Sequence, residues 1–288
     1  MHYLDRKTIL SPKNGMNPYR GCSHGCIYCD SRSLCYSIKH DFEDIEVKRN
    51  AHVVLEAQLR RRRRPCTITT GSMCDPYIPL EEELQVTRKC LEVIERYGFG
   101  LSILTKSARI LRDLDLLKAI CKKAKVVVAL TLTTFDEALC RKIEPNVSTT
   151  YERFGVLEKL CTEGIPTVVW LCPILPFIND TEENLRGILD YCIRAKVQGV
   201  LNFGFGVTLR DGNREYFYKQ LDKNFPGIKQ KYIDHFGDSY MCKSPNNAKL
   251  AALFEQTCRQ HGILFKPKEV FEYLQRYQPV KRQLSLFD

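Results

Sequence analysis

Long hydrophobic runs are missing from this chain of 288 residues. The longest apolar stretches, such as residues 126–130 and 168–171, have the length of one strand. A helix that crosses a bilayer needs about 20 apolar residues. The first ten residues also lack the apolar core of a secretory signal. We therefore expect a cytoplasmic protein that has no membrane partner.

Low-complexity segments and internal repeats are also absent from the sequence, and acidic residues are in the minority. The chain has 44 Lys and Arg against 34 Asp and Glu, which gives a net charge of +10. This excess permits a polyanionic partner such as DNA but does not require one. Five consecutive arginines at residues 60–64 fit either a solvated helix C-terminus, which we favour, or a phosphate contact.

Cysteine is abundant, with 14 residues in the chain. In a reducing compartment these residues are buried thiols, metal ligands or reactive groups rather than disulfides. Several of them, such as Cys121 and Cys192, lie within apolar segments, where a small core residue is the simplest role. Another three are different, because they fall together on one short loop.

Strand-like and helix-like segments alternate over the first 210 residues. Short β-branched stretches predict six strands, at residues 16–20, 66–73, 101–106, 126–133, 166–175 and 199–206. Helical periodicity predicts helices at residues 82–97, 108–124, 150–162 and 182–196. This alternation implies parallel strands joined by crossovers, and six strands suit a partial (β/α)6 barrel, an α/β fold open on one side. Active-site residues are then expected at the C-terminal ends of the strands.

After about residue 210 the pattern becomes helical, with helices expected at residues 213–224, 246–261 and 268–276. We interpret this region as a helical C-terminal extension that covers the open barrel. The expected organisation is a barrel over residues 1–210, the extension over residues 211–277, and a flexible tail over residues 278–288.

One loop carries the most specific metal-ligand pattern in the chain. Cys22, Cys26 and Cys29 have the spacing C-x3-C-x2-C, and thiolates are the ligands that iron–sulfur clusters prefer. Three protein ligands leave one iron of a [4Fe–4S] cubane open to a small molecule. Zinc is the alternative, but it normally takes four protein ligands. His24 would have to fold back to be the fourth, and the spacing to Cys35 matches no pattern that we can support.

This loop resembles the hallmark motif of the radical S-adenosylmethionine (SAM) superfamily, in which an aromatic residue precedes the third cysteine, as Tyr28 does here. Its wider context is similar to the subgroup related to spore photoproduct lyase. The similar segments extend over most of the chain and comprise residues 17–29, 71–77, 79–81, 104–107, 144–145 and 172–173.

The resemblance implies an activity and two cofactors. A reduced [4Fe–4S] cluster cleaves SAM into methionine and a 5′-deoxyadenosyl radical, which abstracts a hydrogen atom from a substrate. A one-electron donor such as flavodoxin or ferredoxin is implied as a partner. By the same resemblance, the SAM contacts fall on Tyr28 beside the adenine, and on Ser72, Cys74, Lys106, Thr131 and Cys172.

Two positions depart from the lyase subgroup. Ser72 stands where the lyase has its hydrogen-donor cysteine, and Asp30 stands where the lyase has tyrosine. Cys74 lies one pleat along the same strand face and is a candidate hydrogen-atom donor, although packing in the SAM site is its simpler role.

The leading interpretation is therefore a lyase-like radical SAM enzyme that acts on nucleic acid, in DNA repair or modification. The alternatives are a radical SAM enzyme that acts on a protein or small molecule, and a non-catalytic metal-binding module.

The C-terminal tail indicates a protein partner. Its QLSLF segment resembles the clamp-binding pentapeptide of bacterial polymerases and repair proteins, with contacts expected from Gln283, Leu284, Leu286 and Phe287. The last two would fill an apolar pocket, and the glutamine would supply a directed hydrogen bond. Binding to the bacterial DNA polymerase sliding clamp would raise the local concentration of the enzyme at DNA. The alternative is an amphipathic tail that folds back on its own domain.

Overall fold

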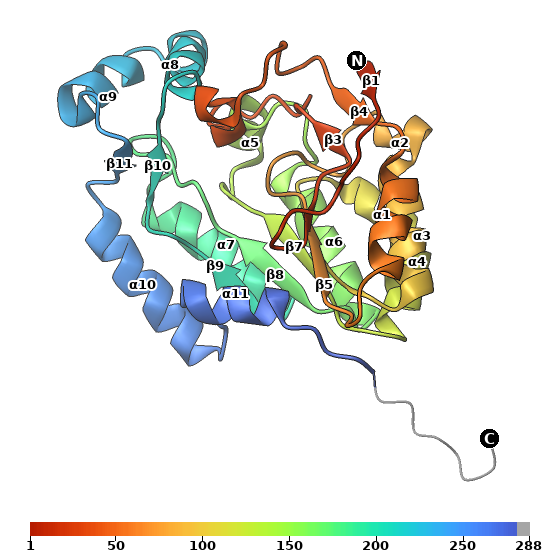
Figure 1. Ribbon diagram of the computed structural model, residues 1–288. Helices are drawn as coiled ribbons and strands as arrows, with labels where there is room; N and C mark the ends of the chain where they lie inside the picture. Colours follow the sequence, from red (N-terminus) through yellow and green to blue (C-terminus); the bar gives the residue numbers. More distant parts are fainter. Residues whose placement is uncertain (281–288) are drawn as a thin grey trace.

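A six-stranded parallel sheet forms the centre of the protein (Figure 1). The structure, a computed structural model, describes residues 1–280. The strand order follows the chain, and every neighbouring pair is parallel. The strands are β2 (Gly15–Met16), β5 (Thr67–Thr70), β6 (Gly100–Thr105), β7 (Val126–Thr131), β8 (Thr167–Trp170) and β9 (Gly199–Leu201). This arrangement confirms the predicted α/β partial barrel.

The central strands are buried on both faces, which explains their nearly continuous apolar sequence. Val128 of β7 belongs to the core that the sheet shares with the outer helices. Its neighbour Val127 points to the opposite face, where it joins Val270 and Leu274 of α11 (Pro267–Gln275). The last helix therefore packs against the concave side of the sheet, where it contacts β9 and β5 (Figure 1).

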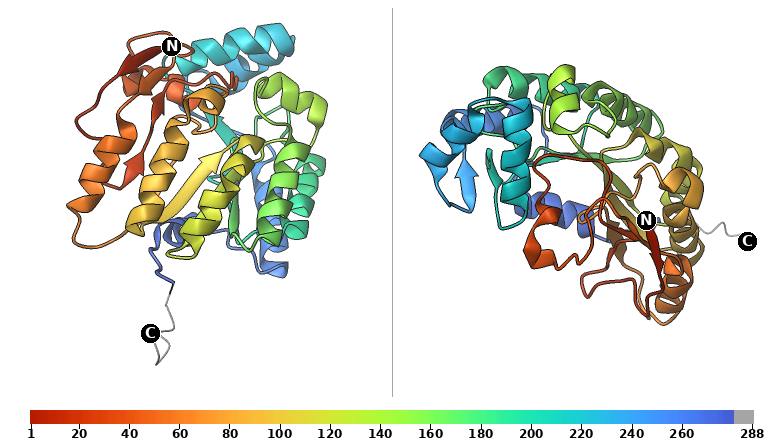
Figure 2. Two further views of the ribbon diagram at one scale, coloured as in Figure 1. Left: turned by 90° about the vertical axis from the view of Figure 1, so that its right-hand side faces the viewer. Right: turned by 90° about the horizontal axis from the view of Figure 1, so that it is seen from above.

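Helices cover the outer, convex side of the sheet (Figure 2). They are α1 (Ala51–Arg60), α3 (Val86–Tyr97), α4 (Leu114–Cys121), α6 (Thr150–Thr162) and α7 (Glu182–Arg194). The short α5 (Glu137–Ile143) packs instead beside α6 and the loop of Cys26 to Tyr28. The arginine run begins at the last residue of α1, as expected for cations at a helix C-terminus.

The helix predicted at residues 82–97 is divided in the structure. Gln85, with φ of 51°, separates α2 (Glu81–Leu84) from α3. The cause is the buried Glu81 carboxylate, which accepts hydrogen bonds from the backbone amides of Thr87 at 2.9 Å and Arg88 at 3.1 Å. A carboxylate in this place satisfies the free amides at the start of α3. Likewise, the helix predicted at residues 108–124 begins as a 3-10 helix before it becomes α4.

A small N-terminal sheet was not predicted. In it, β1 (His2–Leu4) pairs in parallel with β4 (Glu46–Lys48), which pairs antiparallel with β3 (Tyr19–Arg20). The strand predicted at residues 16–20 is therefore two strands, β2 in the large sheet and β3 in the small one. Pro18, which has no amide hydrogen, separates them.

The C-terminal region is mainly helical, as predicted, and contains α8 (Asn213–Asn224), α9 (Ile228–Phe236), α10 (Asn247–Gln260) and α11. The sequence did not predict α9, nor the antiparallel pair of β10 (Gly206–Thr208) and β11 (Met241–Lys243). No helix within residues 1–280 has both the length and the apolar character needed to span a membrane. The clamp-type residues Gln283, Leu284, Leu286 and Phe287 lie outside the described residues.

Candidate active site

The cysteine loop follows β3 and is held by the backbone around it. The Cys22 amide donates to the Phe42 carbonyl at 3.0 Å, and the Ile27 amide donates to the Ile143 carbonyl at 3.0 Å. Gly21 has φ of 82°, and a Cβ at this position would lie 2.5 Å from the Phe42 carbonyl oxygen. The loop therefore needs glycine here, and protein contacts define its shape.

The three thiols of the loop are sheltered from solvent, since Cys22 and Cys26 are buried and Cys29 is partly buried. A hydrogen bond from the neighbouring Cys74 thiol lowers the pKa of Cys22. Burial raises the pKa of Cys26 and of Cys29. Metal ligation stabilises the thiolate form, so three converging thiols in a water-poor loop suit an iron–sulfur cluster.

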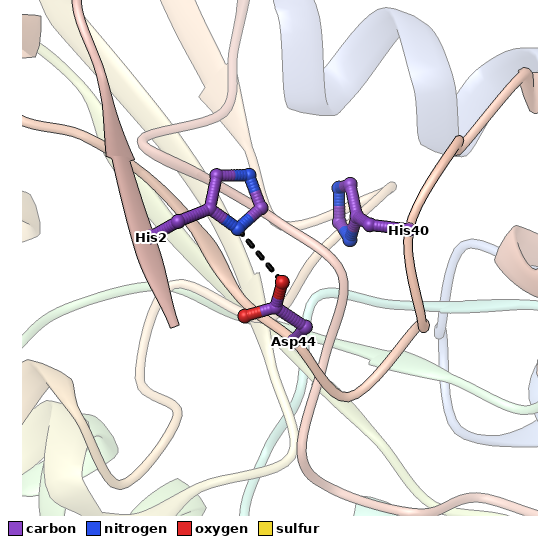
Figure 3. Close-up of side chains that lie close together, drawn as sticks. All are labelled: His2, His40 and Asp44. Carbon is purple, nitrogen blue, oxygen red and sulfur yellow. Dashed lines mark hydrogen bonds and ion pairs between the residues drawn. The ribbon is translucent and has the colours of Figure 1, made fainter.

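The spacing of these thiols disfavours a single zinc ion. Thiolates bound to one zinc ion at about 2.3 Å lie about 3.8 Å from one another. In the described chain, His2, His40 and Asp44 are the only three potential ligands whose ligand atoms all lie within 4.8 Å of one another, and they belong to the N-terminal region (Figure 3). An ion pair of 2.9 Å between His2 and Asp44 accounts for part of that proximity. The loop cysteines form no such group.

Two adjoining cavities open at the C-terminal ends of the strands, where active-site residues were expected. The smaller has a volume of about 80 Å³ and is lined by the three loop cysteines, and the larger has a volume of about 300 Å³. Both are lined by four of the predicted SAM contacts, namely Tyr28, Ser72, Lys106 and Thr131. Cys74 lines only the smaller cavity and Cys172 only the larger. The structure thus brings together all six residues.

Close packing and hydrogen bonds hold the C-terminal ends of β5 and β6 together beside these cavities. Gly71 has φ of 100°, and a Cβ there would overlap the Leu104 carbonyl of β6, so the tight turn requires glycine. The buried Asp75 carboxylate accepts hydrogen bonds from the Thr105 hydroxyl and the Lys106 amide, both at 2.7 Å. Sequence reasoning missed this role of Asp75, although the residue lies in one of the similar segments.

Lys106 supplies a positive charge at the cavity wall. Burial lowers the pKa of its amine, but the nearby Cys26, Glu144 and Asp75 outweigh burial, so the pKa is raised overall. The Lys106 nitrogen lies 5.9 Å from the centre of the Tyr28 ring. A charged amine beside an aromatic face can receive a carboxylate of a bound cofactor.

A fully buried ion pair supports the same wall. The Tyr28 hydroxyl donates to the Glu144 carboxylate, which pairs with Arg153 at 2.6 Å, and Arg153 also donates to the Thr131 carbonyl at 2.6 Å. Burial raises the pKa of Glu144, but Arg153, Lys106 and the tyrosine hydrogen bond lower it overall. The sequence gives no signal for Arg153, which lies inside a predicted helix.

Exposed apolar side chains line the larger cavity as well. The ring centres of Trp170 and Phe203 are 6.0 Å apart, and each lies about 6 Å from that of Phe271. Phe203 is 53% exposed and Met241 is 50% exposed, although both line the cavity. Sequence reasoning missed this group because Trp170, Phe203 and Phe271 lie in separate segments and become neighbours only in the fold.

A parallel partial barrel with three converging thiols at its mouth defines a class of proteins that hold a metal cluster beside an open cavity. The profile of the Radical SAM superfamily matches residues 16–191, more than half of the chain. The protein belongs to this superfamily, and its cofactors are SAM and a [4Fe–4S] cluster. The cysteine loop, the Lys106 charge and the shared cavity wall fit both groups.

Similar sequences occur in bacteria and archaea. An uncharacterized protein of Mycobacterium tuberculosis is 32% identical over 223 residues, which is 75% of this chain and 65% of that protein. An uncharacterized protein of Methanocaldococcus jannaschii is 33% identical over 220 residues, which is 76% of this chain and 78% of that protein. The chain thus matches just under two thirds of the length of the mycobacterial relative.

Solved structures share the fold at low sequence identity. Spore photoproduct lyase complexed with dinucleoside spore photoproduct superposes with a TM-score of 0.63 at 14% identity, covering 91% of this chain and 80% of that one. Streptococcus suis SuiB bound to the precursor peptide SuiA gives a TM-score of 0.54 at 14% identity, covering 87% and 47%. These similarities concern the fold alone.

Proposed function

We propose that this protein is a radical SAM enzyme that acts on nucleic acid, in the repair or modification of DNA. The main observation is that the cavity at the cysteine loop continues into a larger cavity lined by Trp170 and the exposed Phe203. Aromatic faces of this kind stack on nucleobases. A net charge of +10 favours a polyanionic partner, and the fold is similar to that of a lyase solved with a dinucleoside photoproduct.

The cofactors supply the difficult chemistry, and the protein holds and shelters the reactants. When bound and reduced, the cluster would supply the electron for reductive cleavage of SAM, and the pair would provide the chemistry for abstraction of a hydrogen atom from a substrate. Cys22, Cys26 and Cys29 would hold the cluster. Lys106 would bind the SAM carboxylate or ribose, and Tyr28, fixed by its buried hydrogen bond, would pack beside the adenine.

We assign SAM contacts also to Ser72, Cys74, Thr131 and Cys172, which line the cavities. Cys74 is in addition a candidate hydrogen-atom donor. The interaction with the Cys22 sulfur and, to a smaller extent, burial raise the pKa of Cys74, so the thiol keeps the S–H bond that a donor needs. Its hydrogen bond to the Gly21 carbonyl, 2.7 Å long, would have to break first. Unchanged products and unchanged deuterium incorporation in Cys74→Ala would exclude this role.

Two protein partners belong to this proposal. An electron donor such as flavodoxin or ferredoxin would reduce the cluster, and the bacterial sliding clamp would bind the QLSLF tail. A fluorescent peptide of residues 281–288 should bind purified clamp, whereas the same peptide with Leu286 and Phe287 changed to Ala should not. Equal binding by the two peptides, or no binding by either, would remove the clamp from the proposal.

The proposed substrate class is tested with anaerobically reconstituted enzyme, SAM and reductant. Ultraviolet-damaged DNA, undamaged DNA and unrelated peptides are compared as substrates. We expect the damaged DNA to be altered, and binding to DNA to weaken steeply as salt rises. SAM cleavage without any binding to DNA at low salt would contradict a nucleic acid substrate and favour a peptide or small molecule.

A further inference from the structure

A third cavity, with a volume of about 370 Å³, lies next to the other two and shares Met73 with both of them. Three cations line it: Arg6, which follows β1, Arg20 of β3, and Lys48 of β4. No carboxylate lines this cavity. We call it the basic pocket, and it belongs largely to the N-terminal sheet.

The positive charges of the basic pocket are only partly balanced. Arg6 pairs with the buried Glu46 at 2.8 Å. Lys48 instead donates to the main-chain carbonyl of Asn17 at 2.6 Å. Arg20 donates to the main-chain carbonyl of Tyr36, also at 2.6 Å. These carbonyls orient the two cations but do not neutralise them, and within residues 1–280 neither cation forms an ion pair. Three positive charges therefore face one negative charge.

One further observation indicates that the basic pocket is suited to an anion. Burial lowers the pKa of Lys48, and the repulsion from Arg6 and Arg20 adds to this effect, against the attraction of Glu46. A bound anion would offset this repulsion.

We propose that Arg6, Arg20 and Lys48 bind a backbone phosphate of the nucleic acid substrate, an inference that rests on the function proposed above. Guanidinium groups bind phosphate through two parallel hydrogen bonds, and an amine adds a point charge. The basic pocket shares Tyr36 and Met73 with the larger cavity, so a phosphate held here would lie next to a nucleotide in that cavity. Such a contact positions the strand without reading its sequence.

The test compares Lys48→Met with Lys125→Met. Lys125 is a matched control because it is also half-buried, its pKa is also lowered by burial, and its amine also donates to a main-chain carbonyl, that of Tyr273, at 2.5 Å. Both variants lose one positive charge. Lys125 precedes β7, so it lies at the opposite end of the strands from the cavities. Iron content and thermal midpoint are measured first. Lys48→Gln, which keeps a donor for the Asn17 carbonyl, replaces Lys48→Met if the latter loses iron.

The first arm measures DNA binding as a function of salt. We expect Lys48→Met to bind duplex DNA about tenfold more weakly at low salt, since it loses one charged contact. The slope of log K against log salt should fall in magnitude by about 0.9. Lys125→Met and Lys48→Arg should keep the wild-type slope. Equal slopes for Lys48→Met and Lys125→Met would overturn the proposal.

The second arm measures thermal midpoints in inorganic phosphate against chloride at equal ionic strength. A ligand that binds only the folded state raises the midpoint, so phosphate should stabilise the wild type and Lys125→Met more than Lys48→Met. An equal effect on all three proteins, or none, would contradict an anion site. A selective effect in a protein that binds no DNA would overturn the polynucleotide assignment and the proposed function, while the basic pocket would remain an anion site.

Discussion

The two walls of the barrel mouth differ in the side chains that form them. On the side of the cysteine loop, charged groups are buried and paired, as in Glu144 with Arg153 and Asp75 with the Lys106 amide. On the opposite side, apolar side chains are exposed, with Phe203, which follows β9, at 53% and Met241 of β11 at 50%. Buried charges without partners are costly, whereas exposed apolar groups next to a cavity are typical of surfaces that receive a ligand.

From this difference we infer that the two walls bind different groups. A network of buried charges holds its members in one geometry, which suits a cluster and a cofactor that must be oriented before the reaction. Exposed rings bind by stacking and tolerate variation in the ligand. Changes on the first wall should therefore alter cluster and SAM binding, and changes to the exposed rings of the second should alter only substrate binding.

The largest effect is expected from changing Cys22, Cys26 and Cys29 together to Ala. Anaerobically reconstituted wild-type protein should bind about four irons per chain, and the triple variant should bind none, because the ligands of the cluster are removed. Iron analysis and visible absorption measure the result. A triple variant that kept its iron would place the cluster elsewhere.

Glu144→Gln tests the buried network of the same wall. Removal of one charge leaves Arg153 buried and unpaired, which costs about 3–5 kcal/mol and should lower the thermal midpoint by roughly 10 °C at pH 7. Glu163→Gln is the control, because this carboxylate pairs with Lys118 and Lys159 on the surface, and its loss should change the midpoint little.

Glu144→Gln should also change how the thermal midpoint depends on pH. The pKa of Glu144 is lowered in the folded protein, so its stabilising effect is present above the ordinary glutamate pKa of about 4.3. The effect is lost as the pH falls through the lower, folded value. Wild type and Glu144→Gln should therefore converge in midpoint below pH 4. A constant difference between them from pH 7 to pH 3 would contradict the charge assignment.

Lys106→Ala should weaken SAM binding by roughly ten- to a hundredfold, the range expected for one charged hydrogen bond. The cluster should remain, since Lys106 is not a ligand. Lys125→Ala, a half-buried lysine that precedes β7, should leave the SAM dissociation constant unchanged. Calorimetric titration of the reconstituted proteins measures the constants, and equal affinities in all three would exclude the role of Lys106.

The smallest effect is expected on the second wall. Phe203→Ala should weaken binding of a nucleic acid substrate by roughly tenfold, the cost of one lost stacking contact. It should change neither SAM affinity nor iron content. Tyr151→Ala, which removes a ring that is 65% exposed, is the control. If Phe203→Ala instead lowered SAM affinity, the separation of the two walls would fail.

The parallel sheet could be predicted because its signals are local. The strands are short apolar runs bounded by turn residues, and the helices carry their own periodicity. The residues that line the two cavities could also be located in the sequence, since each lies in a short segment such as Leu104 to Ser107. Their roles as cluster and SAM contacts stay predictions.

Features that depend on distant partners could not be predicted. Tyr28 and Glu144, which form one hydrogen bond, are separated by 116 positions in the sequence. The division between α2 and α3 depends on where the Glu81 carboxylate points, and the strands of the N-terminal sheet are too short for a periodic signal. The basic pocket combines residues of β3 and β4 with Arg6, which follows β1, so its charges become a group only in the fold.

The central claim is that the cysteine loop and its cavity cleave SAM reductively. The most direct measurement is anaerobic incubation of the iron-loaded protein with SAM and a strong reductant, followed by quantification of 5′-deoxyadenosine. We predict that the wild type forms 5′-deoxyadenosine and that the triple variant of Cys22, Cys26 and Cys29 forms none. Iron-loaded wild type that produced no 5′-deoxyadenosine, with or without candidate DNA, would contradict the claim and leave a metal-binding module.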